Sequence, residues 1–88
     1  MGLDEKINSI IKLLDQLLED RSVPRNIKEG IEKAKKSLLD KSREVVVRID
    51  AAIQSLEEVS DDPNIPMFAR TQIWNAITLL EMLESEVR

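Results

Sequence analysis

One stretch of the chain is repeated, and this repeat constrains the fold more than any other feature of the sequence. The segment EDRSVPRNIKEGIEKA, residues 19–34, shares its pattern with DDPNIPMFARTQIWNA, residues 61–76, which lies 42 positions further on. In both copies an acidic pair closes an apolar run and is followed by a polar residue, a β-branched residue and a proline. Proline lacks an amide hydrogen and fits the first turn of a helix. Each copy is therefore predicted to be a turn between two helices.

Apolar residues recur at helical spacing in four segments, which predicts helices over residues 3–19, 24–39, 43–59 and 66–87. The first has this spacing in Leu3, Ile7, Ile10, Leu14 and Leu17, and the last in Ala69, Ile73, Ala76, Leu80, Leu83 and Val87. Three consecutive valines near the start of the third segment would suit a strand. The pattern from Ile49 onward has a helical period, so the third segment is predicted to be a helix as well.

The 88 residues are predicted to form a single all-helical domain, because 42% hydrophobic residues are enough for one modest core. An up-and-down four-helix bundle would bury all four apolar stripes together. The alternative is a pair of HEAT-like helical hairpins, because three acids are each followed eight residues later by a base: Asp20 and Lys28, Asp40 and Arg48, Asp62 and Arg70. Two such repeats are fewer than a solenoid usually needs, so the bundle is favoured.

Two local features of these helices also lead to predictions. Gly30 lies inside the helix predicted over residues 24–39, where it costs up to about 1 kcal/mol relative to alanine. A close approach by a neighbouring helix would explain the glycine. Ser42 precedes the helix predicted over residues 43–59, and a serine side chain there is predicted to cap the helix by accepting an amide hydrogen bond.

The two turn motifs also support a resemblance. EDRSVPRNIK and DDPNIPMFAR, the latter followed by TQIWN, together with the length of the chain, are similar to small archaeal proteins that form the uncharacterised protein family 0147. The similarity covers nearly the whole chain. It implies a compact all-helical protein of an archaeal cytoplasm. It implies no activity, ligand or catalytic residue.

The composition argues against an enzyme. The chain has no histidine, cysteine or tyrosine, which are the side chains that most readily transfer protons or attack substrates near neutral pH. The acidic pairs could bind a hard cation, but neither an EF-hand loop nor a di-iron helix motif surrounds them, so neither a metal site nor a cofactor is predicted. The absence of cysteine fits a reducing cytoplasm, and no apolar run approaches the roughly eighteen residues that span a membrane.

The charge of the chain is unevenly distributed, and residues 21–48 carry a net charge of +5 between acidic flanks. The basic side chains that could contact phosphate are Lys28, Lys33, Lys35, Lys36, Lys41 and Arg43. No aromatic residue lies among them, and no nucleic-acid-binding signature surrounds them. The favoured interpretation is that these bases pair with acidic residues on neighbouring helices. The alternative is weak contact with an RNA backbone.

Three large side chains do not fit the apolar seam of the helix predicted over residues 66–87: Met67, Trp74 and Met82, with Phe68 as a further candidate beside them. They are either covered as a small second cluster or exposed. Methionine and tryptophan are favoured at protein interfaces, so exposure would indicate a docking surface for another protein or for a second copy in a homodimer. The predicted function is a non-catalytic protein-interaction module. An RNA- or ribonucleoprotein-associated accessory protein is the alternative.

Overall fold

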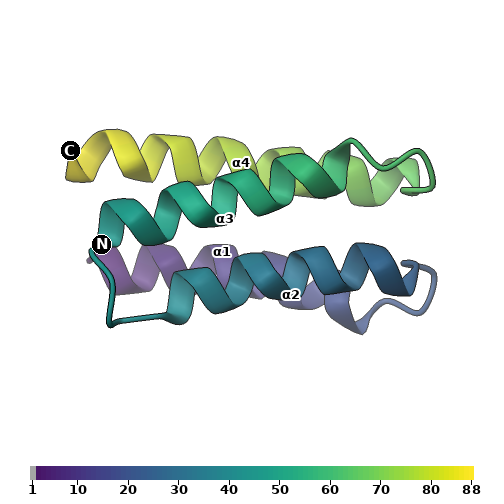
Figure 1. Ribbon diagram of the computed structural model, residues 1–88, viewed down its shortest axis with the longest axis horizontal. Coiled ribbons are helices and arrows are strands. Elements are labelled where there is room, and N and C mark those ends of the chain that lie inside the picture. Colours follow the sequence, from purple (N-terminus) through teal and green to yellow (C-terminus); the bar gives the residue numbers. More distant parts are fainter. Residues whose placement is uncertain (1) are drawn as a thin grey trace.

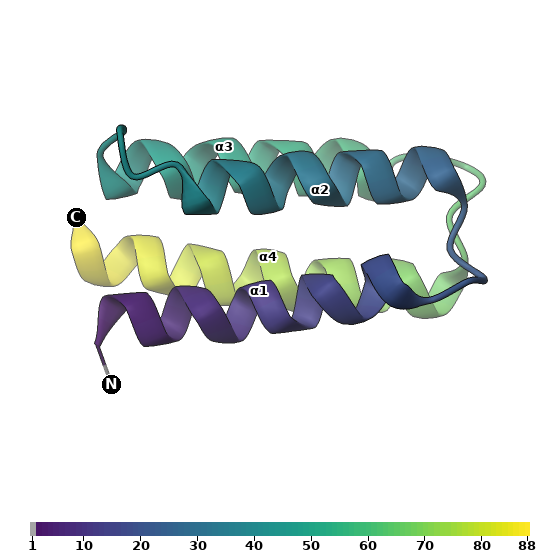
Figure 2. The same ribbon diagram turned by 90° about the horizontal axis from the view of Figure 1, so that it is seen from below.

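The computed structural model describes residues 2–88, which form four helices: α1 (Leu3–Glu19), α2 (Arg25–Leu39), α3 (Val45–Ser60) and α4 (Met67–Val87). Each helix runs antiparallel to the next, and the bundle measures 34 × 21 × 20 Å (Figures 1 and 2). The α1–α2 and α3–α4 turns lie at one end, and the α2–α3 turn lies at the other end with both termini (Figure 1). The predicted up-and-down four-helix bundle is confirmed.

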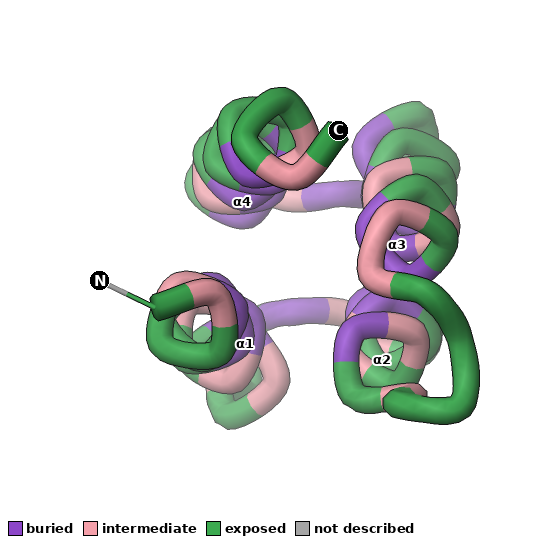
Figure 3. Tube along the Cα trace, turned by 90° about the vertical axis from the view of Figure 1, so that its left-hand side faces the viewer, coloured by how far each residue is buried: buried purple, intermediate pink, exposed green. Residues whose placement is uncertain are grey.

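The core lies on the long axis of the bundle. Viewed along that axis, the helices occupy the corners of a square and turn their buried residues inward (Figure 3). Among residues 2–88, the buried hydrophobic residues are isoleucine, leucine, valine and alanine only, since Phe68 and Trp74 both lie at the surface. Each large aliphatic side chain buried in this way stabilises the fold by about 1.5–3 kcal/mol relative to exposure. None of the helices within residues 2–88 is both long enough and apolar enough to cross a membrane.

The three turns share one hydrogen-bonding pattern. In each, an aspartate carboxylate accepts the backbone N–H two residues later: Ser22 to Asp20 at 2.8 Å, Ser42 to Asp40 at 3.1 Å and Asn64 to Asp62 at 2.8 Å. This side-chain mimic of a backbone turn stops one helix and redirects the chain. The hydrogen bonds from the serines hold the pKa values of Asp20 and Asp40 below their usual range.

The prediction that Ser42 caps α3 was wrong. Both its N–H and its hydroxyl donate to Asp40, so the side chain belongs to the preceding turn. Glu44 is the residue that precedes α3, and α3 begins at Val45 rather than at the predicted residue 43. The helices α2 and α4 each begin one residue after their predicted starts, because Pro24 and Pro66 adopt extended backbone conformations just outside them.

The spacing of eight residues between acid and base has a structural origin in these turns. The basic residue lies in the first turn of the next helix and donates its N–H to the residue just before that helix: Lys28 to Pro24, Arg48 to Glu44 and Arg70 to Pro66, each at 3.0 Å. Its positive charge therefore lies near the negative C-terminal end of the preceding helix. The side chain of Arg48 contacts this helix end directly, because its Nε donates to the Leu38 carbonyl at 3.1 Å.

The predicted close approach at Gly30 is confirmed. A Cβ atom built at this position would overlap Cγ2 of Val59, which projects from α3 onto α2. A larger residue at position 30 would therefore have to displace Val59 or push the two helices apart. The glycine allows α2 and α3 to pack at their observed separation.

Candidate interaction surface

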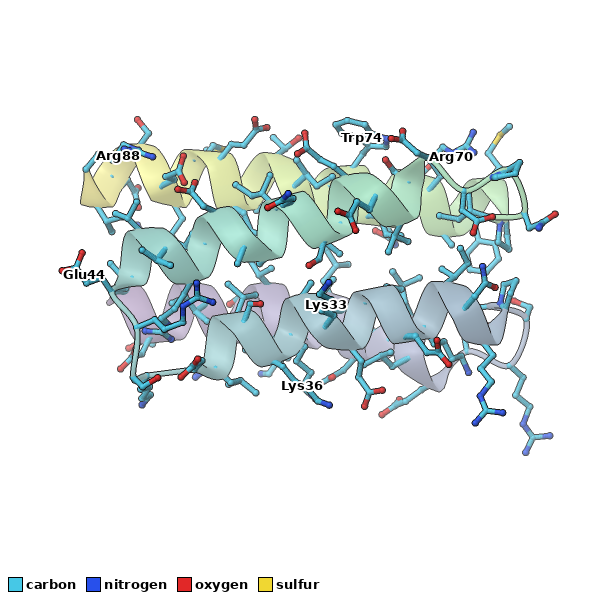
Figure 4. The ribbon with its side chains drawn as sticks, in the orientation of Figure 1. Lys33, Lys36, Glu44, Arg70, Trp74 and Arg88 are labelled. Carbon is cyan, nitrogen blue, oxygen red and sulfur yellow. The ribbon has the colours of Figure 1, made fainter. Side chains whose placement is uncertain are left out.

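The outward face of α4 carries the candidate docking residues. Residues 71–80, TQIWNAITLL, contain no charged side chain. All four predicted candidates are exposed, with exposed fractions of 81% for Met67, 45% for Phe68, 47% for Trp74 and 61% for Met82. Side chains three, four and seven positions apart share a helix face, so Met67, Thr71, Trp74 and Thr78 line one strip pointing away from the core. Trp74 and Arg70 project from α4 away from the bundle (Figure 4).

A shallow hollow extends this face toward α1. It has a volume of about 270 Å³ and is lined by Lys6, Ser9, Ile10, Leu79, Met82, Leu83 and Glu86. Four of these seven lining residues are apolar, and Lys6 Nζ pairs with Glu86 Oε2 at 2.7 Å to link the two helices. The hollow is therefore apolar and has a charged bridge beside it.

Leu79 belongs to this surface but was not predicted as a candidate. Its side chain is 44% exposed and lies one helical turn before Met82. A leucine in an amphipathic helix fits either the core or its edge, so its exposure depends on how α1 packs beside α4. The sequence feature that could have identified Leu79 as a candidate is its position outside the apolar seam formed by residues 73, 76, 80 and 83.

The basic candidates do not form one paired network. Among these six candidates, only Lys35 pairs with an acid on another helix within residues 2–88, through Asp15 Oδ1 at 2.7 Å, and Lys28 is half-buried. Four others are exposed and take part in no ion pair within residues 2–88: Lys33, Lys36, Lys41 and Arg43. Lys33 and Lys36 lie on α2 (Figure 4), which also carries the exposed acidic residues Glu29 and Glu32. The predicted pairing across helices therefore holds for Lys35 alone.

The acidic residues come together at one point near the C-terminus. The interaction of Glu84 with the Asp50 carboxyl group raises the pKa of Glu84, partial burial adds to this effect, and Arg88 opposes it. Arg88 Nη2 lies 3.5 Å from Asp50 Oδ2, and Arg88 Nε lies 3.6 Å from Glu84 Oε1. This cluster links α3 to the end of α4. Across residues 2–88, no three potential metal ligands from aspartate, glutamate, histidine or cysteine gather at one point.

The model of the uncharacterised protein family UPF0147 matches residues 1–83. The chain belongs to this family. It is 45% identical to a UPF0147 protein of Thermococcus kodakarensis over 93% of this chain and 100% of that protein. It is 41% identical to a UPF0147 protein of Methanocaldococcus jannaschii over 92% of this chain and 87% of that protein. The resemblance inferred from the two turn motifs is thereby confirmed.

Two crystal structures have the same fold as this UPF0147 protein. A protein of unknown function, MMP1188, matches with a TM-score of 0.86 and 41% identity over 89% of each chain. A UPF0147 protein of Thermoplasma acidophilum matches with a TM-score of 0.85 and 30% identity over 91% of this chain and 94% of that chain. The family and the four-helix fold are thus established, and the description of the family states no activity.

Proposed function

We propose that this UPF0147 protein is a non-catalytic interaction module that docks on another protein, or on a second copy of itself, through the outward face of α4. The observation that carries this proposal is the half-exposed Trp74 in the middle of a ten-residue stretch without charge. Tryptophan and methionine are enriched at protein interfaces, and contiguous exposed apolar surface is uncommon on monomeric proteins unless it binds something. The nearby exposed side chains of Met67, Leu79 and Met82 extend this surface along the helix.

The hollow between α1 and α4 supports a protein partner rather than a small cofactor. Sites for small molecules are usually about 300–1,000 Å³ and enclose most of the ligand. The hollow is smaller, at about 270 Å³, and lies open at the surface beside Met82. A space of this kind suits one apolar side chain of a partner. The non-catalytic part of the proposal is supported by the sequence, which lacks histidine, cysteine and tyrosine.

The test compares two substitutions at equally exposed apolar positions. Trp74→Asp places a charge on the proposed face, and Leu39→Asp is the matched control, since Leu39 is 49% exposed at the end of α2. Tagged wild type and both variants are used to capture partners from native cell extract after nuclease treatment, and far-UV circular dichroism checks that each is folded. We expect wild type and Leu39→Asp to retain a common partner that Trp74→Asp loses. Retention of all partners by a folded Trp74→Asp variant would exclude this face.

A second candidate function is association with RNA or a ribonucleoprotein. It is favoured by the four exposed basic residues on α2 and in the α2–α3 turn that have no ion pair within the described chain. A triple charge reversal, Lys33→Glu, Lys36→Glu and Lys41→Glu, tests it while sparing Lys35, which is paired with Asp15. Under this alternative, the triple variant and nuclease treatment would both remove the partners, and Trp74→Asp would retain them.

A further inference from the structure

The residues along the outward face of α4 are arranged symmetrically about its centre. Three pairs of face residues have midpoints within one residue of position 76: Trp74 with Thr78, Thr71 with Met82, and Met67 with Ser85. All six are exposed. In a twofold dimer, residue i of one copy meets residue j of the other while j meets i, so such an interface must be complementary to itself. When two copies lie antiparallel about a twofold axis near position 76, each of these pairs places one member opposite the other member in the second copy.

On the basis of the docking function proposed above, we propose that the outward face of α4 binds a second copy of this chain. The two α4 helices pack antiparallel about a twofold axis near residue 76. Trp74 of each copy then lies beside Thr78 of the other, where the face is uncharged. Apolar and small polar side chains meet along the centre of this contact, and charged side chains lie only at its edges.

The charges at one edge of the face are complementary in this arrangement. Arg70 and Glu81 are eleven residues apart, which places them about 16 Å apart along the helix but within about 20° of each other around it. Their midpoint, like that of the face, lies close to residue 76. A twofold axis there brings Arg70 of each copy beside Glu81 of the other. Both side chains are exposed, and neither takes part in an ion pair within residues 2–88.

The other edge of the face contains a projecting side chain and the hollow. The twofold axis places Phe68 of one copy opposite position 84 of the other. The residues of α4 that line the hollow extend from Leu79 to Glu86, so Phe68 arrives within about 2 Å of its centre along the helix. Phe68 is 45% exposed, and its helical phase places it on the same side of α4 as Leu79 and Glu86, which line the hollow. The apolar hollow beside α1 therefore receives the phenyl ring of the second copy, and does so twice in each dimer.

Sedimentation analysis of the purified full chain at rising concentration provides the first test. We expect a species of twice the 10.1 kDa mass of one chain, in a concentration-dependent equilibrium. Trp74→Asp and Phe68→Ala should each shift this equilibrium to the monomer, and Leu39→Asp should leave it unchanged. A monomer at every concentration would overturn the proposal.

Charge reversal tests the pairing at the first edge. Arg70→Glu alone and Glu81→Arg alone each replace two attractive contacts per dimer with repulsive ones, so each should weaken dimerisation about tenfold. The double variant Arg70→Glu/Glu81→Arg exchanges the partners and should restore the dissociation constant to within about threefold of wild type. Additive weakening in the double variant would contradict the pairing, because two unrelated surface effects would add.

Cysteine cross-linking tests the direction of the helices. The chain contains no cysteine, so each introduced thiol is unique. Asn75→Cys lies beside the proposed axis and should form a disulfide-linked dimer on mild oxidation. Ser85→Cys is the control on the same face, because the axis places its two copies about 27 Å apart along the helix. Cross-linking of Ser85→Cys without Asn75→Cys would indicate a different arrangement and overturn the antiparallel dimer.

Failure of the dimer and failure of the docking function give different results. If the protein is monomeric but Trp74→Asp still loses partners that Leu39→Asp retains, the dimer proposal is wrong. The outward face of α4 then remains supported as a docking surface for another protein. If the protein is monomeric and Trp74→Asp loses nothing, both proposals fail. A dimer that follows the charge reversals and the Asn75→Cys cross-link supports both.

Discussion

The contact between Gly30 and Val59 leads to a prediction in which two opposing effects can be separated. Replacing glycine by alanine inside a helix stabilises it by about 1 kcal/mol. At Gly30, the added Cβ would overlap Cγ2 of Val59, and overpacking of this kind costs about 1–3 kcal/mol. We therefore expect Gly30→Ala to lower the free energy of unfolding by about 0–2 kcal/mol, despite its favourable effect on helix propensity.

Removing the methyl groups of Val59 should reverse the sign of the effect of Gly30→Ala on the free energy of unfolding. Val59→Ala deletes two methyl groups from a side chain that is 7% exposed, and it should cost about 2 kcal/mol alone. The Val59 Cβ lies 3.6 Å from the Cβ built at Gly30, which is an ordinary van der Waals contact. In the Val59→Ala background, Gly30→Ala should therefore stabilise the protein by about 1 kcal/mol.

Urea unfolding followed by far-UV circular dichroism measures all four proteins of this double-mutant cycle. Circular dichroism is preferred to fluorescence because Trp74 is half-exposed in the folded protein and reports weakly on the core. We expect the two substitutions together to be less destabilising than the sum of the single effects. Equal effects of Gly30→Ala in both backgrounds would refute the close packing of α2 against α3 as the reason for the glycine.

Three further predictions concern charged side chains. Arg48→Met removes the two hydrogen bonds that the buried guanidinium donates to the Leu38 carbonyl near the end of α2, and it should lower the free energy of unfolding by about 1.5–3 kcal/mol, as measured in urea. The lowered pKa values of Asp20 and Asp40 stabilise the folded state above the ordinary pKa of 3.8, so wild type should lose stability as the pH falls below this value, and Asp20→Asn/Asp40→Asn should lose less. Asp50 raises the pKa of Glu84, so the ionised form of Glu84 destabilises the folded state. Glu84→Gln should therefore be at least as stable as wild type at pH 7 in thermal unfolding, and this difference should vanish below the ordinary pKa of 4.5.

Most of the fold could be predicted from the sequence because each helix has its own apolar stripe. The stripe of α1 ends at Leu17, and the stripe of α4 runs unbroken from Ala69 to Leu83, so local periodicity alone located both helices. The repeated turn defined their boundaries to within two residues. The wrongly predicted cap, Ser42, lies two residues after Asp40, whose carboxylate accepts hydrogen bonds from the same hydroxyl and amide groups. Local preference could not decide between these two hydrogen-bonding arrangements.

The candidate site was less predictable, because exposure depends on neighbouring helices. The position of Trp74 opposite the apolar seam was clear from its helical phase, but the sequence left open whether another element covers it. Leu79 and the hollow beside Met82 follow from the placement of α1 next to α4, which no local pattern specifies. The same holds for Lys35, whose partner Asp15 lies 20 residues away on another helix. Contacts between helices therefore could not be predicted from the sequence, whereas the residues that share one helix face could.

The central claim is that the outward face of α4 is a docking surface, and nuclear magnetic resonance titration tests it most directly. Amide and indole resonances of the labelled protein are followed as its concentration rises from micromolar to millimolar, and again as a captured partner is added. The account predicts that the largest shifts lie at the Trp74 indole and at Thr71, Thr78 and Met82. Shifts confined to Lys33 and Lys36 on α2 and to Lys41 in the α2–α3 turn, with the Trp74 indole unmoved in both titrations, would contradict it.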